Sequence, residues 1–167
     1  MRQTDSRVAL LAAALGLGLA TDVRAELIDR GTYNGVKLIY DTTQRITWIG
    51  DANWAQNSGA DDDGVMTWEE ASRWASSLRI AGFSDWRLPL TFDATCRGLN
   101  CTNSEMGSLF SNDGISADNP GPFHNVQARQ YWSRRGNPEA GVAWALNFGS
   151  GEQSDADLNS GFVPWAV

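Results

Sequence analysis

The chain has few of the residues that enzymes use for nucleophilic catalysis. Its one histidine is His124, so any Ser–His or Cys–His catalytic pair would have to include it. The surrounding residues 121–125 do not resemble the sharp turn that presents a nucleophile. A loop histidine that hydrogen-bonds to backbone is far more common than a catalytic one. The sequence therefore nominates no catalytic residue, and we expect a protein that is not an enzyme.

Basic residues are outnumbered by acidic ones, 13 to 20, and the formal net charge is −7. Residues 1–25 contain three of the basic residues and two of the acidic ones, which leaves 10 and 18 in the remainder and a net charge of −8. An acidic surface repels phosphate backbones, so we expect no nucleic-acid partner. No basic amphipathic segment indicates binding to a membrane surface either.

A hydrophobic run long enough to span a bilayer, about 20 residues, is also missing. The longest apolar run covers residues 8–20; it follows Arg2 and Arg7 and precedes Val23 and Ala25, which suit the two key positions of a cleavage site. We interpret residues 1–25 as a secretory signal peptide, with an uncleaved anchor as the alternative. The mature chain, residues 26–167, is then expected to be a single domain that is secreted, periplasmic or on the cell surface, and not an integral membrane protein.

Cysteine occurs twice, at Cys96 and Cys101. Two ligands are too few for a structural zinc site, and the Cys-x-x-x-x-Cys spacing differs from the Cys-x-x-Cys of redox-active pairs. In an exported chain an isolated pair of cysteines is most simply one disulfide. We therefore expect Cys96 and Cys101 to close a small loop.

One helix pattern is clear in the first half of the mature chain. Thr67 and Glu70 form a Thr-x-x-Glu capping box, which is typical of a helix start. Gly82 lies where the helix would end. Apolar residues at helical spacing follow the cap, namely Ala71, Trp74, Ala75 and Leu78.

Strand patterns surround this helix. Residues 26–50 predict a β-hairpin with its turn at residues 41–43, and a polar loop is expected at residues 53–64. Ser104 is a good N-cap for a short second helix that ends near Phe110. This order of elements predicts an α+β domain with two helices, antiparallel strands and long loops. Further strands are expected around Trp86 and at residues 130–133, 142–148 and 162–167.

These segments together resemble a known family. They resemble the Lcl C-terminal domain family, a bacterial family of domains of unknown function, and the Cys96/Cys101 loop is similar to that of its exported branch. The resemblance implies a C-type-lectin-like fold that is shared with the sulfatase-modifying-factor group. The matching segments are residues 38–42, 46–48, 66–68, 82–89, 104–107, 131–133 and 143–148.

The resemblance implies no established activity. The family is named for a collagen-like surface adhesin that binds sulfated polysaccharide and cell surfaces, whereas this chain has no collagen-like repeat. We expect an exported, non-catalytic, adhesion-like binding module for glycan or protein surfaces. Two alternatives stay open: a formylglycine-generating-type enzyme, which would need reactive cysteines and copper, and a structural component of an extracellular matrix or surface layer.

An acidic loop is the best candidate for a metal site. Asp61, Asp62 and Asp63, with Glu70 beyond them, resemble the second half of a calcium-binding loop. The first ligand position of such a loop falls on Gly59, which has no side chain to offer. A solvated acidic loop is therefore favoured over a calcium site, and we expect a binding module without a cofactor unless calcium binds in this loop.

The candidate ligand-binding residues also come from loops. Trp54 lies in the polar loop, where its indole could stack on a sugar ring. Asn137 and Glu139 flank a proline and could hold a cation together with sugar hydroxyls, or form a plain turn. Arg134 and Arg135 could contact an anionic ligand, although paired surface arginines need no such role. The sequence does not indicate an oligomeric state.

Overall fold

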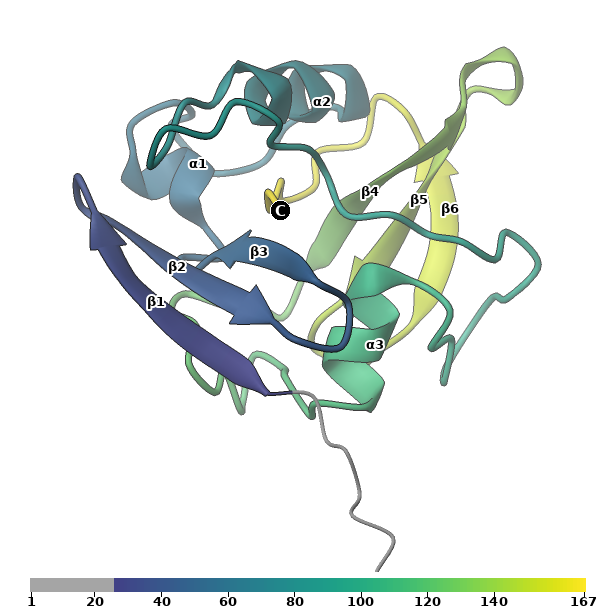
Figure 1. Ribbon diagram of the computed structural model, residues 1–167. Helices are drawn as coiled ribbons and strands as arrows, with labels where there is room; N and C mark the ends of the chain where they lie inside the picture. Colours follow the sequence, from purple (N-terminus) through teal and green to yellow (C-terminus); the bar gives the residue numbers. More distant parts are fainter. Residues whose placement is uncertain (1–25) are drawn as a thin grey trace, which may run out of the picture.

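Two three-stranded antiparallel sheets lie on opposite sides of the C-terminal segment (Figure 1). The structure is a computed structural model that describes residues 26–167, so the predicted signal peptide at residues 1–25 lies outside the described residues. One sheet has the order β1–β2–β3 and the other the order β4–β5–β6. The strands are β1 (Leu27–Tyr33), β2 (Val36–Asp41), β3 (Ile46–Ile49), β4 (Gln130–Asn137), β5 (Val142–Asn147) and β6 (Gln153–Asp157).

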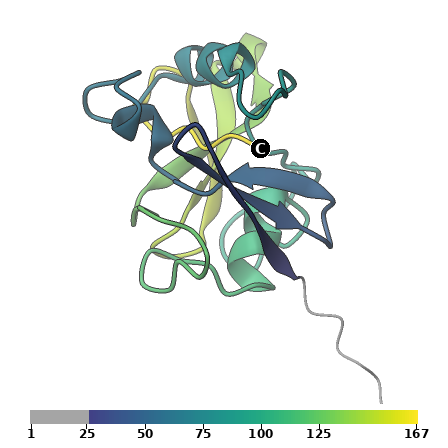
Figure 2. The same ribbon diagram turned by 60° about the vertical axis from the view of Figure 1, so that its left-hand side comes forward.

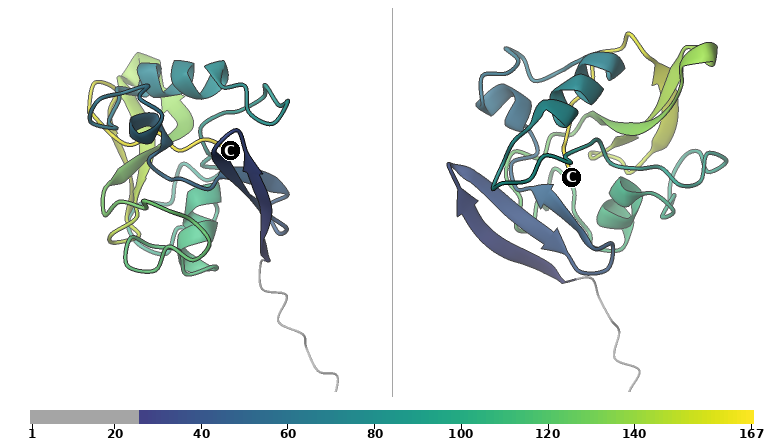
Figure 3. Two further views of the ribbon diagram at one scale, coloured as in Figure 1. Left: turned by 90° about the vertical axis from the view of Figure 1, so that its left-hand side faces the viewer. Right: turned by 45° about the horizontal axis from the view of Figure 1, so that its top comes forward.

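Helices at both ends of the sheets complete an α+β fold, as the sequence predicted. The helices are α1 (Trp54–Asn57), α2 (Trp68–Ser77), α3 (Glu105–Ser111) and the 3-10 helix η1 (Pro138–Ala140). α1 and α2 lie at one end of the molecule and α3 at the other (Figures 1 and 3). α1 forms within residues 53–64, which were expected to be loop, and adds one helix to the two expected. Within residues 26–167, no helix has the length and apolar character needed to cross a membrane.

The hairpin predicted at residues 26–50 is confirmed as β2 and β3, and β1 adds a third strand in front of it. Its turn is fixed by Asp41, whose Oδ1 accepts hydrogen bonds from the backbone N–H groups of Thr43 and Gln44, both at 2.9 Å. Successive side chains of a strand point to opposite faces of the sheet, and Leu38 and Ile39 are both buried, at 3% and 0% exposed. β2 is therefore a central strand that is covered on both faces.

The capping box that starts α2 is confirmed. The Thr67 side chain accepts a hydrogen bond from the Glu70 backbone N–H, and the Glu70 carboxylate accepts one from the Thr67 backbone N–H at 3.0 Å. The predicted stop near Gly82 is wrong, because α2 ends at Ser77. The chain becomes extended at Leu78 and then forms a tight turn with Gly82 at a φ of +83°. α3 begins as predicted, since the Ser104 hydroxyl accepts a hydrogen bond from the Gly107 backbone N–H.

Two expected strands are absent, and one strand was not expected. The segment around Trp86 is extended but joins neither sheet; its backbone instead pairs with Val167 through Arg87, with N–O distances of 3.0 and 2.9 Å. Residues 162–167 form only isolated bridges and no strand. β6 was missed because its polar sequence, Gln-Ser-Asp-Ala-Asp, has no apolar alternation. It is a strand because its backbone completes a ladder with β5 from Val142 to Leu146.

The C-terminal segment passes between the two sheets (Figure 2), and its Trp165 belongs to an aromatic core. Trp165 is 1% exposed, and its ring centroid lies 5.0 Å from those of Trp48 and Phe123. Its indole N–H donates to the Ile49 carbonyl at 2.7 Å. Trp165 therefore links the C-terminal segment to the first sheet through both packing and a buried hydrogen bond.

Candidate functional site

The disulfide loop at residues 96–101 is built onto the outer edge of the second sheet. Cys96 and Cys101 are bonded to each other, as the sequence predicted. Gly98 exchanges two backbone hydrogen bonds with Gln153 of β6, both at 2.8 Å. The buried Gln153 side chain also donates to the Cys96 carbonyl at 3.0 Å. The loop is thus held in register with β6 by backbone pairing as well as by the disulfide.

This placement puts Arg97 over the face of the second sheet. Its guanidinium carbon lies 4.7 Å from the ring centroid of Trp144 on β5, which is cation–π geometry. The same guanidinium donates to both carboxylate oxygens of Asp155, the residue paired with Trp144 in the β5–β6 ladder. These hydrogen bonds lower the pKa of Asp155 and raise that of Arg97. Arg97, Trp144 and Asp155 therefore form one ordered cluster.

A hollow of about 540 Å³ opens beside this cluster, and we call it the disulfide-loop cleft. Arg135 lines it and donates from Nη1 to the Phe92 carbonyl at 3.0 Å. Two arginines and one aspartate line the cleft, which gives it a positive balance on an acidic protein. Its lining residues are Ala94, Arg97, Arg135, Gly136, Asn137, Ala140, Val142, Trp144 and Asp155.

The ligand-binding residues predicted from the sequence are distributed over several places. Arg135 and Asn137 line the disulfide-loop cleft, and the Asn137 side chain also accepts a hydrogen bond from the Ala140 backbone as the N-cap of η1. Glu139 is exposed within η1 and is not among the residues that line this cleft. Trp54 begins α1 and packs, half-buried, against the core.

Arg134 belongs to a different hollow of about 450 Å³, which we call the α2 cleft. Successive side chains of a strand point to opposite faces of the sheet, and this separates Arg134 from Arg135. The two arginines, which the sequence suggested as one anion-binding pair, therefore line two different hollows. The α2 cleft is lined by Trp68, Ser72, Ser76, Ser84, Asp85, Trp86, Arg87, Leu88 and Arg134.

The acidic loop uses much of its hydrogen-bonding capacity on its own backbone. Asp61 Oδ1 accepts from the backbone N–H groups of Asp63 and Gly64 at 3.1 and 2.7 Å, and Asp63 Oδ1 accepts from that of Val65 at 3.0 Å. Asp62 is exposed. Among residues 26–167, no three His, Cys, Asp or Glu side chains gather in a group that could hold a metal ion. Calcium binding by this loop stays a prediction.

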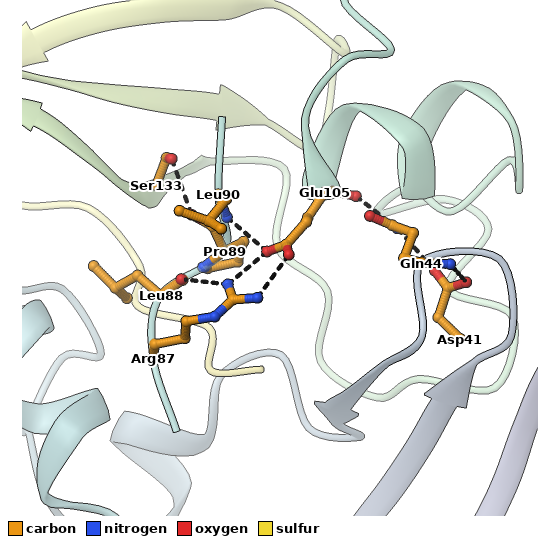
Figure 4. Close-up of polar contacts among 8 residues, drawn as sticks. All are labelled: Asp41, Gln44, Arg87, Leu88, Pro89, Leu90, Glu105 and Ser133. Atoms are coloured by element: carbon orange, nitrogen blue, oxygen red, sulfur yellow. Dashed lines mark hydrogen bonds and ion pairs between the residues drawn. The ribbon is translucent and has the colours of Figure 1, made fainter. Parts of the chain in front are cut away.

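A buried polar network joins α3 to the segment beside the α2 cleft (Figure 4). Glu105 is 3% exposed and accepts from both terminal nitrogens of Arg87 and from the Leu90 backbone N–H at 2.6 Å. Gln44 links the Glu105 carbonyl, at 3.1 Å, to the Asp41 carboxylate, at 2.8 Å. This network holds the backbone of residues 87–90 in place. Because Arg87 and Leu88 line the α2 cleft, it also positions one wall of that cleft.

Sequence reasoning missed three residues of the disulfide-loop cleft, Arg97, Trp144 and Asp155. The apolar pattern of residues 142–148 marked Trp144 as a strand residue but gave no sign of its arginine partner. Arg97 and Asp155 are 58 residues apart, and nothing in the local sequence of either indicates the other. Their meeting depends on the pairing of the disulfide loop with β6, which is a tertiary feature.

Comparisons with known proteins support the sequence-based resemblance. No curated protein and no solved structure matches the chain. The family model of the Lcl C-terminal domain matches residues 37–167, which include all of β2 except its first residue, every later helix and strand, and both clefts. The chain therefore belongs to the Lcl C-terminal domain family.

Proposed function

We propose that this protein is an exported, non-catalytic binding module for glycan or protein surfaces, and that the disulfide-loop cleft is a binding site. The observation behind the proposal is the cluster of Arg97, Trp144 and Asp155 beside Arg135. It offers hydrogen-bond donors and acceptors whose positions are set before a ligand arrives. Such preorganisation lowers the entropy cost of binding.

The loop that borders the cleft also presents apolar side chains to solvent. Phe92 and Leu99 are 54% and 61% exposed. Residues 91–103 project beside the second sheet (Figure 3). Exposed apolar groups next to polar ones are typical of surfaces that bind other macromolecules. A ligand in the cleft can therefore gain apolar contact area from the same loop.

Export is part of the proposal, as is a C-type-lectin-like fold. The signal-peptide pattern of residues 1–25 favours export, and disulfides persist mainly in oxidising compartments outside the cytosol. In the alternative formylglycine-generating-type enzyme, cysteines would have to be reactive thiols, whereas Cys96 and Cys101 are bonded here. Two reactive thiols in a thiol assay on the native protein would favour that enzyme over a binding module.

The proposal is tested by screening the mature protein against a glycan array and against cell-surface proteins. We expect a hit whose affinity falls in Arg135→Gln but not in Arg129→Gln. Arg129 is a matched control because it is exposed just before β4 and outside the cleft. Equal loss in both variants would contradict the cleft as the site. Failure to bind any glycan or surface protein, with self-association instead, would favour a structural role.

A further inference from the structure

We infer that the α2 cleft binds a neutral sugar unit of an oligosaccharide. The inference rests on the proposed binding function, but it concerns a separate site and names its ligand class. The cleft lies between α2, β4 and residues 84–88 and holds about 450 Å³. It is lined by three serines, Ser72, Ser76 and Ser84, and by two tryptophans, Trp68 and Trp86. Hydroxyl groups and aromatic rings together match the polar edge and apolar face of a pyranose.

The charges of the cleft balance. Arg87 is neutralised by its two hydrogen bonds to Glu105. Arg134 and Asp85 remain, both exposed, and neither side chain has a hydrogen-bonded or ion-paired partner among residues 26–167. An acidic ligand would meet a free carboxylate together with the free guanidinium. A sugar hydroxyl both donates and accepts, so adjacent hydroxyls can satisfy Asp85 and Arg134 together without a net charge.

Two polar groups of the cleft residues have no partner within the described chain. They are the Ser72 hydroxyl and the Trp86 indole N–H, and both atoms are buried. Trp86 as a whole is 5% exposed. Buried polar groups in folded proteins nearly always have a hydrogen-bond partner. A hydroxyl-rich ligand in this cleft has the donors and acceptors needed to supply such a hydrogen-bond partner.

An exposed aromatic ring extends the site. A neighbouring hollow of about 250 Å³ shares Asp85, Trp86 and Arg87 with the α2 cleft and is lined by Phe83. Phe83 is 59% exposed and is held at the end of a two-residue turn in which Ala81 has a φ of +55°. A non-glycine residue in this region is strained. The strained turn keeps the ring at the surface, where a second sugar unit can stack on it.

The test is a titration of the ¹⁵N-labelled mature protein with neutral tetrasaccharides of glucose and of mannose, and with oligogalacturonate and a sulfated tetrasaccharide. We expect neutral sugars to move the indole N–H signals of Trp86 and Trp68. The signal of Trp165, which is bonded to the Ile49 carbonyl in the core, should stay fixed and report that each variant is folded. Arg134→Gln and Phe83→Ala should each weaken binding about tenfold.

Matched controls come from outside both clefts. Tyr33→Ala removes an exposed ring, 46% exposed, and Arg129→Gln removes an exposed arginine, and both residues lie outside both clefts. Neither should change binding of neutral sugars. Binding of acidic sugars alone, or shifts confined to the disulfide-loop cleft, would overturn the inference and leave the proposed function standing. The absence of binding to every sugar and surface protein would overturn both.

Discussion

The guanidinium of Arg87 and the carboxylate of Glu105 form a bidentate ion pair inside the protein, with both N–O distances at 2.7 Å. The Glu105 side chain is 4% exposed and that of Arg87 is 24% exposed. Glu105 is the first residue of α3, and Arg87 is one of the residues that line the α2 cleft. The pair (Figure 4) therefore connects α3, at one end of the molecule, to a cleft that is lined in part by α2, at the other end (Figure 1).

Replacing Glu105 by Gln should destabilise the protein strongly. The change removes the charge that balances Arg87, and an unpaired buried charge is costly. We expect the free energy of unfolding to fall by about 3 kcal/mol, measured by urea denaturation. Glu69→Gln is the control, since the Glu69–Arg73 pair is 3.8 Å long and both side chains are mostly exposed. Similar losses in both variants would show that the Glu105 pair contributes little.

The carboxyl of Asp113 should make stability fall as the pH rises. Burial, together with the nearby Asp41, raises the pKa of Asp113 to about 6. The folded state then holds a proton between about pH 4 and 6 that the unfolded state has released, so ionisation in this range costs stability. The full shift corresponds to roughly 3 kcal/mol, but Asp113 is only partly buried, and screening reduces the expected cost to about 1 kcal/mol.

Asp113→Asn removes this cost. Relative to the natural protein, the variant should gain about 1 kcal/mol in unfolding free energy between pH 4 and pH 7, measured by urea denaturation at each pH. Asp118→Asn, at an exposed position of the same loop, should show no such trend. If the difference in unfolding free energy between Asp113→Asn and the natural protein does not change with pH, the raised pKa assigned to Asp113 is wrong.

Gly107→Ala should destabilise α3, although alanine is the better helix former. In a solvent-exposed helix interior this substitution gains about 1 kcal/mol. At Gly107, however, an added Cβ would lie 1.8 Å from the Cys101 carbonyl oxygen and 2.6 Å from the capping hydroxyl of Ser104. We expect a net loss of about 3 kcal/mol, measured by thermal or urea unfolding. Ser111→Ala, at the exposed end of the same helix, should be close to neutral.

The features predicted correctly from the sequence are those that a few neighbouring residues determine. Thr67 and Glu70 cap α2 through mutual hydrogen bonds three residues apart, and Ser104 caps α3 in the same local way. The Cys96–Cys101 disulfide also needs only a short loop. In each case the sequence contains both partners within one turn or loop, so local chemistry was enough.

The features that were not predicted correctly depend on partners far away in the chain. β6 is polar throughout, and only its pairing with β5 and with Gly98 makes it a strand. The apolar residues 162–167 look like a strand but are shared among several partners, including Val163 with β4 and Trp165 with Ile49. For the same reason both clefts, whose walls come from distant segments, could not be assembled from the sequence.

The pairing of Gly98 with Gln153 also bears on whether copies of the protein aggregate. It covers the outer edge of β6 at Gln153, the first residue of the strand, while Val163 pairs with the outer edge of β4. Open sheet edges are templates for strand-to-strand aggregation. In the first sheet, β1 is an edge strand with a neighbour on one side only. Its pairing with β2 is interrupted by a register shift between Asp29 and Thr32, and bulges of this kind discourage pairing at a sheet edge. We therefore expect the disulfide loop to hinder strand-to-strand pairing at this end of β6, independently of any ligand.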